Sequence, residues 1–223
     1  MKNIAALLIL IIIICSCKYK IVSPFDGVSD SINDNNSNKN LYIIDANATE
    51  TDIKDALQKN IESTGKNIII VEGYIGANSK IFDNIKNTLK NKTNIELDLS
   101  KAVMENNYIY TLENALFVTT VYFASSQKII ANFFKGCTSL VNVQLPSLLL
   151  IIDNSSFENC NSLKNIEYLG TSPNTIVGTP FTGTVKPSDL YLPNVAKDPG
   201  DGRWKNFLGA DWVNIHYGTP MPK

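Results

Sequence analysis

The chain has little of the material from which a metal or cofactor centre is built. Among its 223 residues there is one histidine, His216, and there are four cysteines. Cys15 and Cys17 lie near the N-terminus, which leaves only Cys137 and Cys160 in the rest of the chain. A structural zinc site takes four such ligands, and two cysteines with one histidine do not supply them. We therefore expect no metal and no cofactor.

Motifs for phosphate binding, nucleic-acid binding and catalysis are also missing. The 20 basic and 21 acidic residues nearly balance and form no basic run, so we expect no nucleic-acid partner. The scattered glycines form neither GxGxxG nor GxxxxGK[ST]. No serine or cysteine pairs in sequence with His216 as a nucleophile would. Glu96, Asp98 and Glu167 resemble a glycosidase carboxylate set only loosely and fit solvent-facing strand positions better. The sequence predicts a protein that is not an enzyme.

The N-terminus carries an apolar run from Ile4 to Ile14 that contains no polar residue. A membrane-spanning helix needs about 20 apolar residues, so this run is too short to span and is typical of the core of a secretory signal peptide. It ends in ICSC, which resembles the lipobox of bacterial lipoproteins, where the cysteine begins the mature chain and carries lipid. We predict a signal peptide at residues 1–16 and lipidation of Cys17. An ordinary secretory signal with an incidental cysteine is the alternative.

Residues 17–40 are rich in asparagine, serine and aspartate and contain little to bury. This composition is typical of a flexible tether between a lipid anchor and a folded domain. About 180 residues remain, enough for one well-filled domain. The sequence therefore predicts a membrane-anchored lipoprotein that is localised at the outer membrane or cell surface.

The strongest pattern is an internal repeat. The stretch FFKGCTSLVNVQLP at 133–146, which contains Cys137, returns as SFENCNSLKNIEYL at 156–169, which contains Cys160. A fixed period in the twenties indicates one structural unit stacked on copies of itself, each burying its neighbour's apolar side. Equivalent strand positions lie about 4.8 Å apart, so the two cysteines form either a disulfide or two buried thiols, and we favour thiols.

Short apolar segments recur along the chain with a similar spacing and predict one strand per repeat, all parallel. The predicted strands are 42–44, 68–71, 95–99, 121–123, 143–145, 166–168, 190–192 and 213–215. We expect Phe117, Phe134, Phe157 and Phe181 to point inward opposite the sheet. The copy at 112–120 is expected to lack the GCTSL piece of the repeat.

The first two connections have helical periodicity. Residues 51–63 place their apolar side chains on one face, with Thr49 or Thr51 as N-cap and Gly65 just past the end. Residues 79–91 form a second amphipathic segment with Ser79 as a possible N-cap. The predicted organisation is a β-α-β capping region at 41–99, repeats with a C-terminal cap at 100–215, and a tail at 216–223.

The motif F-x-x-C-x-S-L-x-x-[VI]-x-[LY], present at 134–145 and 157–168, resembles the BspA-like leucine-rich repeats. Weaker copies extend the similarity to residues 95–215, and the ending resembles spirochaetal members. The resemblance implies an α/β fold: a short leucine-rich-repeat solenoid with one parallel sheet of seven or eight strands, helices in the N-terminal coils and irregular C-terminal returns. It also implies surface display and, in some members, adhesion.

The candidate binding residues are outward strand positions, which we expect to stack into two ladders. The first ladder is Glu96, Tyr122, Gln144, Glu167, Tyr191 and Asn214. The second ladder is Thr120, Asn142, Asn165, Asp189 and Trp212. Exposed aromatics among amides and carboxylates suit protein or glycan recognition. The sequence therefore predicts a surface lipoprotein that binds a macromolecule through this face. The alternative is a structural periplasmic or envelope component with no soluble ligand.

Overall fold

The computed structural model describes residues 41–106, 108–109, 111–173, 176–183 and 185–222. The predicted signal peptide, the predicted tether and Cys17 lie outside these residues. In the described ranges no helix is both long enough and apolar enough to cross a membrane.

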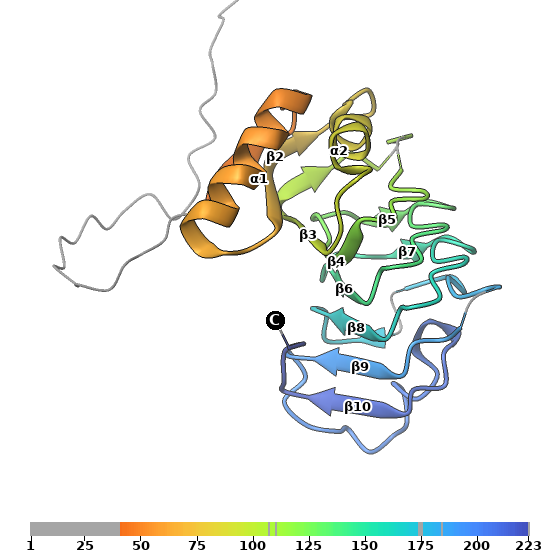
Figure 1. The fold of residues 1–223 in the computed structure, drawn as a ribbon. Helices are drawn as coiled ribbons and strands as arrows, with labels where there is room; N and C mark the ends of the chain where they lie inside the picture. Colours follow the sequence, from red (N-terminus) through yellow and green to blue (C-terminus); the bar gives the residue numbers. More distant parts are fainter. Residues whose placement is uncertain (1–40, 107, 110, 174–175, 184, 223) are drawn as a thin grey trace, which may run out of the picture. The chain divides into compact units, whose positions relative to one another are not determined.

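In the described part of the chain, eight strands form one parallel sheet in which the strands follow each other in chain order (Figure 1). They are β1 (Ile43–Asp45), β2 (Ile68–Ile75), β3 (Ile95–Met104), β4 (Val118–Tyr122), β6 (Asn142–Leu145), β8 (Asn165–Tyr168), β9 (Asp189–Leu192) and β10 (Asn214–Tyr217). Each overlaps one predicted segment, so the parallel sheet with one strand per repeat is confirmed.

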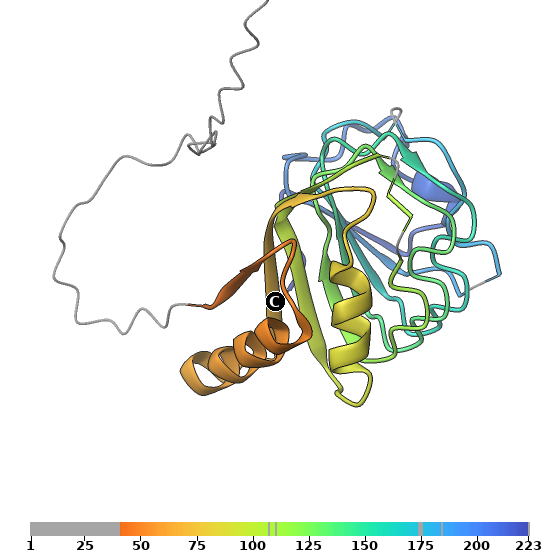
Figure 2. The same cartoon turned by 90° about the horizontal axis from the view of Figure 1, so that it is seen from above.

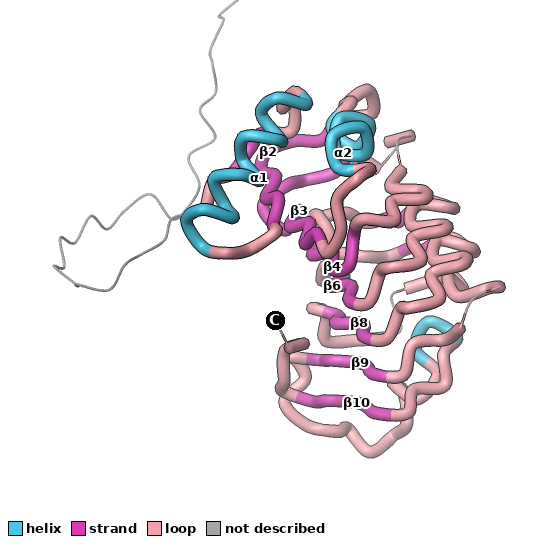
Figure 3. The backbone as a smooth tube through the Cα atoms, viewed as in Figure 1, coloured by secondary structure: helices cyan, strands magenta, loops and turns pink. Residues whose placement is uncertain are grey.

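The return segments are mostly irregular, as Figure 3 shows, and one small feature in them was not predicted. Strands β5 (Lys128–Ile129) and β7 (Ile151–Ile152) pair in parallel, and Val177 extends the pairing through a single bridge to Ile151. Both strands are too short to produce a recognisable alternation of apolar and polar residues in the sequence.

Helix α1 spans Glu50–Thr64 and has well-defined ends. Thr49 is the N-cap: its hydroxyl accepts from the Asp52 N–H at 3.3 Å while the Asp52 carboxylate accepts from the Thr49 N–H at 2.8 Å. Gly65, with φ 73°, donates to the Ile61 carbonyl at 2.8 Å. Such a reciprocal pair satisfies amides that the first turn leaves free. The structure therefore selects Thr49 over Thr51 and confirms Gly65.

Helix α2 spans Ile81–Leu89, and its N-cap residue is Lys80, which makes no side-chain capping bond. Ser79 is therefore not the N-cap residue, but its hydroxyl accepts from the Ile81 N–H at 3.3 Å, so its predicted role of satisfying a free amide of this helix is confirmed. The same hydroxyl donates to the carbonyl of Ala46 at 2.9 Å and so joins the start of α2 to the end of β1. Helix α2 lies on the same side of the sheet as the return segments (Figure 2).

A line of aromatic rings runs through the core from α2 toward β10. The ring centroids are 5.4 Å apart for Phe82 and Phe133, 5.0 Å for Phe134 and Phe157, and 5.6 Å for Phe157 and Phe181. Phe133 and Phe134 are themselves in contact at 4.7 Å. Stacked copies of one phenylalanine position thus seal each repeat against the next, which confirms the inward direction of Phe134, Phe157 and Phe181.

The repeat at 112–120 is complete, contrary to the predicted deletion. Leu112, not Phe117, occupies its phenylalanine position, because the Leu112 carbonyl accepts from Cys137 Sγ just as the Phe134 carbonyl accepts from Cys160 Sγ. Two positions later a left-handed residue follows in four repeats: Asn114, Gly136, Asn159 and Gly183, with φ between 60° and 74°. Phe117 is buried elsewhere in the core.

Cys137 and Cys160 are free, buried thiols, as favoured from the sequence. Their Sγ atoms lie 3.1 Å and 3.0 Å from the carbonyl oxygens that they contact in the preceding repeat. Burial raises the pKa of Cys137 to about 12 and raises that of Cys160 as well. Both therefore act as small core residues with weak donors rather than as reactive thiols.

Candidate binding face

Alternate strand residues point away from the core and form the sheet face, which we define by two rows of side chains in register across the strands. The first row is Ile70, Asp98, Tyr122, Gln144, Glu167, Tyr191 and His216. The second row is Ile68, Glu96, Thr120, Asn142, Asn165, Asp189 and Asn214.

The predicted ladders were right in the middle of the sheet and wrong at both ends. Tyr122 is in register with Asp98 rather than Glu96, and Tyr191 with His216 rather than Asn214. At β3 the pairing with β4 shifts between Ile95 and Glu96, an irregularity of the β-bulge kind. Glu96 and Asn214 therefore belong to the second row.

Trp212 belongs to neither row, so its predicted place on the second ladder was wrong. It precedes β10, is 8% exposed, and its Nε1–H donates to the Phe207 carbonyl at 2.9 Å. Its ring packs edge-on against Phe181. Trp212 closes the end of the aromatic line instead of presenting a binding surface.

A chain of hydrogen bonds runs along the second row. The Asn165 amide donates to Asn142 Oδ1 at 2.7 Å, and the Asn142 amide donates to Thr120 Oγ1 at 3.0 Å. The three polar side chains satisfy one another across adjacent strands, which helps to fix the register of the sheet.

The N-terminal part of the sheet face is open and forms a notch of about 350 Å³. The notch is lined by Leu41, Lys66, Ile68, Glu96, Asp98, Ser100, Tyr122 and Gln144. Asp98 Oδ1 accepts from the N–H and hydroxyl of Ser100 at 2.9 Å and 2.6 Å, which fixes its orientation. The notch therefore presents two partly exposed carboxylates, one lysine and one amide around an apolar floor.

The C-terminal part of the sheet face is covered by the chain itself. After β10 the Gly218 N–H donates to the carbonyls of Leu192 and Val195 at 3.0 Å and 2.8 Å, and the segment runs back toward β8 (Figure 1). The predicted boundary of the tail, at residue 216, falls inside β10. We call residues 219–222 the C-terminal strap.

Met221 is the buried residue of the strap. It is 4% exposed and forms a second apolar cluster with Tyr122 and Tyr191, separate from the main core. Its backbone N–H donates to Glu167 Oε2 at 2.5 Å, and the Gln144 amide donates to the other oxygen of Glu167. The expected exposure of Tyr122, Glu167 and Tyr191 was therefore wrong, because the strap lies over them.

His216 lies at the C-terminal edge of the first row. Its Nε2 is 3.1 Å from Asp189 Oδ1 and its ring stacks on Tyr191 at 4.3 Å. Asp189 also accepts from the Asn214 amide at 2.9 Å and from the Ser188 hydroxyl. Burial by itself would raise the pKa of Asp189, but these donors outweigh it and hold the pKa below its ordinary value.

Two of the carboxylates considered above, Asp98 and Glu167, lie too far apart to act as a catalytic pair. Asp98 and Glu167 stand in the same row but three strands apart, about 14 Å at the usual strand spacing, which is wider than glycosidase carboxylate pairs. Ser188 donates to Asp189 and not to His216. Within the described residues no three His, Cys, Asp or Glu side chains are grouped as a metal site.

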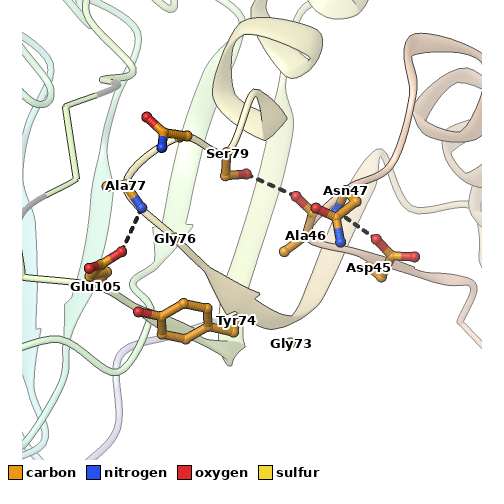
Figure 4. Close-up of a pocket in the computed structure, with 10 residues that line it drawn as sticks. Asp45, Ala46, Asn47, Gly73, Tyr74, Gly76, Ala77, Ser79 and Glu105 are labelled. Carbon is orange, nitrogen blue, oxygen red and sulfur yellow. Dashed lines mark hydrogen bonds between the residues drawn. The ribbon is translucent and has the colours of Figure 1, made fainter. Parts of the chain in front are cut away.

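A larger groove of about 760 Å³ lies where β1 and β2 end (Figure 4). Glu105 Oε2 accepts from the Ala77 N–H there at 2.7 Å, and Tyr74 is 61% exposed at its rim. The groove is open and its polar groups tie loops together, so the sheet face is the better candidate. Sequence reasoning missed this groove because its lining comes from three segments that are far apart in the chain, at 45–47, 73–79 and Glu105.

Comparison with known proteins gives one result. Residues 105–201 match a family model whose description is BspA type leucine rich repeat region (6 copies). No curated protein and no solved structure matches the chain. The match covers β4 to β9 and confirms the repeat type that the FxxCxSL motif indicated. Leucine-rich repeats generally mediate protein-protein interaction or adhesion and are typically not enzymes.

Proposed function

We propose that the chain is a short leucine-rich-repeat solenoid that binds a macromolecular partner through its sheet face. The observation that carries the proposal is the open notch around Glu96, Asp98 and Gln144. It combines two carboxylates, of which Asp98 is oriented by Ser100, with an amide and an apolar floor on a hydrogen-bonded sheet, a composition suited to directional recognition. The repeat type supports a binding role rather than a catalytic one.

The charge of the notch indicates which partner groups it accepts. Glu96 and Asp98 lie on the same strand and are countered by a single cation, Lys66, among the residues that line the notch. A partner that brings a lysine or arginine, or a row of hydrogen-bond donors, complements these two carboxylates. Rim charges of this kind act mainly on association rate and specificity.

Charge reversal in the notch tests the proposal. The double variant Glu96→Lys, Asp98→Lys is compared with Asp55→Lys, Glu62→Lys, which makes the same change in net charge on exposed positions of α1. Capture from surface extracts of host and bacterial cells is measured with both variants after equal melting temperatures are established. We expect at least tenfold weaker capture by the notch variant, equivalent to about 1.4 kcal/mol, and unchanged capture by the α1 variant. Equal capture by both would refute the role of the notch.

The localisation of the protein is a further part of the proposal. A lipid on Cys17 and a tether at 17–40 would hold the repeats at the outer membrane or cell surface. Metabolic labelling with a radioactive fatty acid is expected to mark the wild-type chain and to leave Cys17→Ser unmarked. Labelling of both would show that Cys17 is not the lipid carrier.

The alternative function is a structural envelope component that faces the periplasm and has no soluble ligand. Protease treatment of intact cells separates the two. Surface display predicts cleavage of the repeats, whereas periplasmic residence predicts protection until the outer membrane is opened.

A further inference from the structure

The C-terminal strap contacts the sheet face in the way a bound peptide does. Met221 stands between Pro220 and Pro222, neither of which has an N–H, so within this tripeptide its backbone offers the one donor. That donor goes to Glu167, and the Met221 side chain enters the cluster with Tyr122 and Tyr191. One charge-assisted hydrogen bond and one buried side chain make up the contact.

The receiving groups are held in place without the strap. Glu167 projects from β8 and its second oxygen is fixed by the Gln144 amide of β6. Tyr191 is stacked on His216, whose ring is held by Asp189. A carboxylate and an aromatic wall fixed by neighbouring strands form a preorganised recognition site.

The strap itself is only lightly attached. Thr219, Pro220 and Pro222 are exposed, and Met221 is the single buried residue among those described after Gly218. Segments with so few buried contacts open at much lower cost than the core of the protein. Its methionine side chain is also of the adaptable type that binding surfaces use.

We propose that Tyr122, Glu167 and Tyr191 form a binding pocket for a proline-flanked apolar peptide segment of a protein partner, and that the strap is its intramolecular competitor. The inference rests on the proposed function, since it assigns the partner class for the same face. A protein is favoured over a glycan because the pocket already receives a backbone N–H and a thioether side chain. The strap then keeps the apolar part of the face covered until a partner displaces it.

Peptide binding tests this pocket. The probe is the synthetic peptide GTPMPK, which has the sequence of residues 218–223, with GTPSPK as its control. The receptors are the full chain, a chain ending at Gly218, and the full-length variant Met221→Ser, which keeps every backbone group. Binding is followed by NMR shifts of backbone amides in β4, β8 and β9, a readout suited to affinities in the millimolar range. Melting temperatures confirm that each receptor is folded.

We expect saturable shifts in the shortened chain and in Met221→Ser, and at least tenfold weaker binding by the wild-type chain, in which the strap acts at a high effective concentration. GTPSPK is expected to bind at least tenfold more weakly than GTPMPK, and Glu167→Gln in the shortened chain to weaken GTPMPK binding severalfold. Absence of binding to either folded receptor, equal binding to the wild type, or saturable shifts with an oligosaccharide but not the peptide would overturn the proposal.

The two proposals fail separately. Loss of partner capture by the Glu96→Lys, Asp98→Lys variant without peptide binding by the shortened chain would leave the notch and remove the peptide pocket. Peptide binding by the shortened chain together with unchanged partner capture by the Glu96→Lys, Asp98→Lys variant would leave the peptide pocket and remove the notch.

Discussion

The backbone N–H of Met221 lies 2.5 Å from Glu167 Oε2, although 54 residues separate the two in the chain. This contact carries the C-terminus back over β9 to β8 and removes three aligned side chains of the sheet face from solvent. The repeat face is consequently divided into an open, acidic part around Glu96 and Asp98 of β3 and a covered part that extends from Tyr122 of β4 to Tyr191 of β9.

The aromatic line through the core is expected to be the main source of coupling between repeats. Phe157 contacts Phe134 on one side and Phe181 on the other and is fully buried. Phe157→Ala should lower the free energy of unfolding by about 3–5 kcal/mol, because it leaves a cavity between two repeats. Phe157→Leu should cost clearly less. Urea unfolding monitored by circular dichroism measures both, and equal costs would argue against a tightly packed aromatic line.

The left-handed position of the repeat gives a prediction about backbone strain. Gly136 has φ 71°, and a Cβ there would lie 2.2 Å from Asn114 Oδ1, so Gly136→Ala should destabilise the fold by at least about 1 kcal/mol. Asn159 holds the same place one repeat later with φ 61°, and Asn159→Gly should be near neutral or slightly stabilising. Thermal unfolding of the two variants checks the pair. Similar losses in both would contradict a shared left-handed position.

Capping of α1 distinguishes two neighbouring threonines. Thr49→Ala removes the side chain that accepts from the Asp52 N–H and should cost about 1 kcal/mol. Thr51 is exposed inside the first turn, so Thr51→Ala should change stability by no more than about 0.5 kcal/mol. Chemical denaturation compares the two variants directly. A larger loss of stability in Thr51→Ala than in Thr49→Ala would show that Thr49 is not the N-cap residue.

The Asp189 cluster predicts a pH dependence of stability. The donors Ser188, Asn214 and His216 hold the pKa of Asp189 below its unfolded value of about 3.9, so the folded state favours the carboxylate. This stabilisation is fully present above that unfolded pKa and is lost as pH falls through the folded pKa. Asp189→Asn should therefore lower the free energy of unfolding at pH 7 by about 1–3 kcal/mol. On acidification this variant should lose less stability than the wild type does.

Urea unfolding at pH 7 and pH 3 measures this difference. The control is Asp211→Asn, whose carboxylate is exposed and meets Lys186 only at 3.9 Å. We expect the control to follow the wild type at both pH values. If the wild type and Asp189→Asn lose the same free energy of unfolding between pH 7 and pH 3, Asp189 does not contribute in this way.

The middle of the fold could be predicted because the repeats there differ little in length. Between β4 and β9 the nearly constant spacing of the apolar segments carries directly into the observed pairing of Tyr122, Gln144, Glu167 and Tyr191. The first helix was predictable for a different reason, since its apolar face, Thr49 and Gly65 are local signals.

The ends of the face could not be predicted because their geometry depends on contacts distant in sequence. The register shift at Glu96 follows from how β3 meets β4, and spacing alone does not reveal it. Burial of Tyr122 and Tyr191 depends on Met221, which belongs to a short segment without any period. The alternation of apolar and polar residues along the strands correctly predicted which side of the sheet these residues occupy. It contains no information about which segment covers that side.

Site-specific photo-crosslinking on intact cells tests the central claim most directly. A photoreactive amino acid replaces Lys66 at the edge of the notch in one variant and Lys90, exposed just after α2, in the other. If the sheet face is the binding surface, illumination should give a covalent adduct with a partner from position 66 and none from position 90. An adduct from position 90 alone, or equal adducts from both positions, would contradict it.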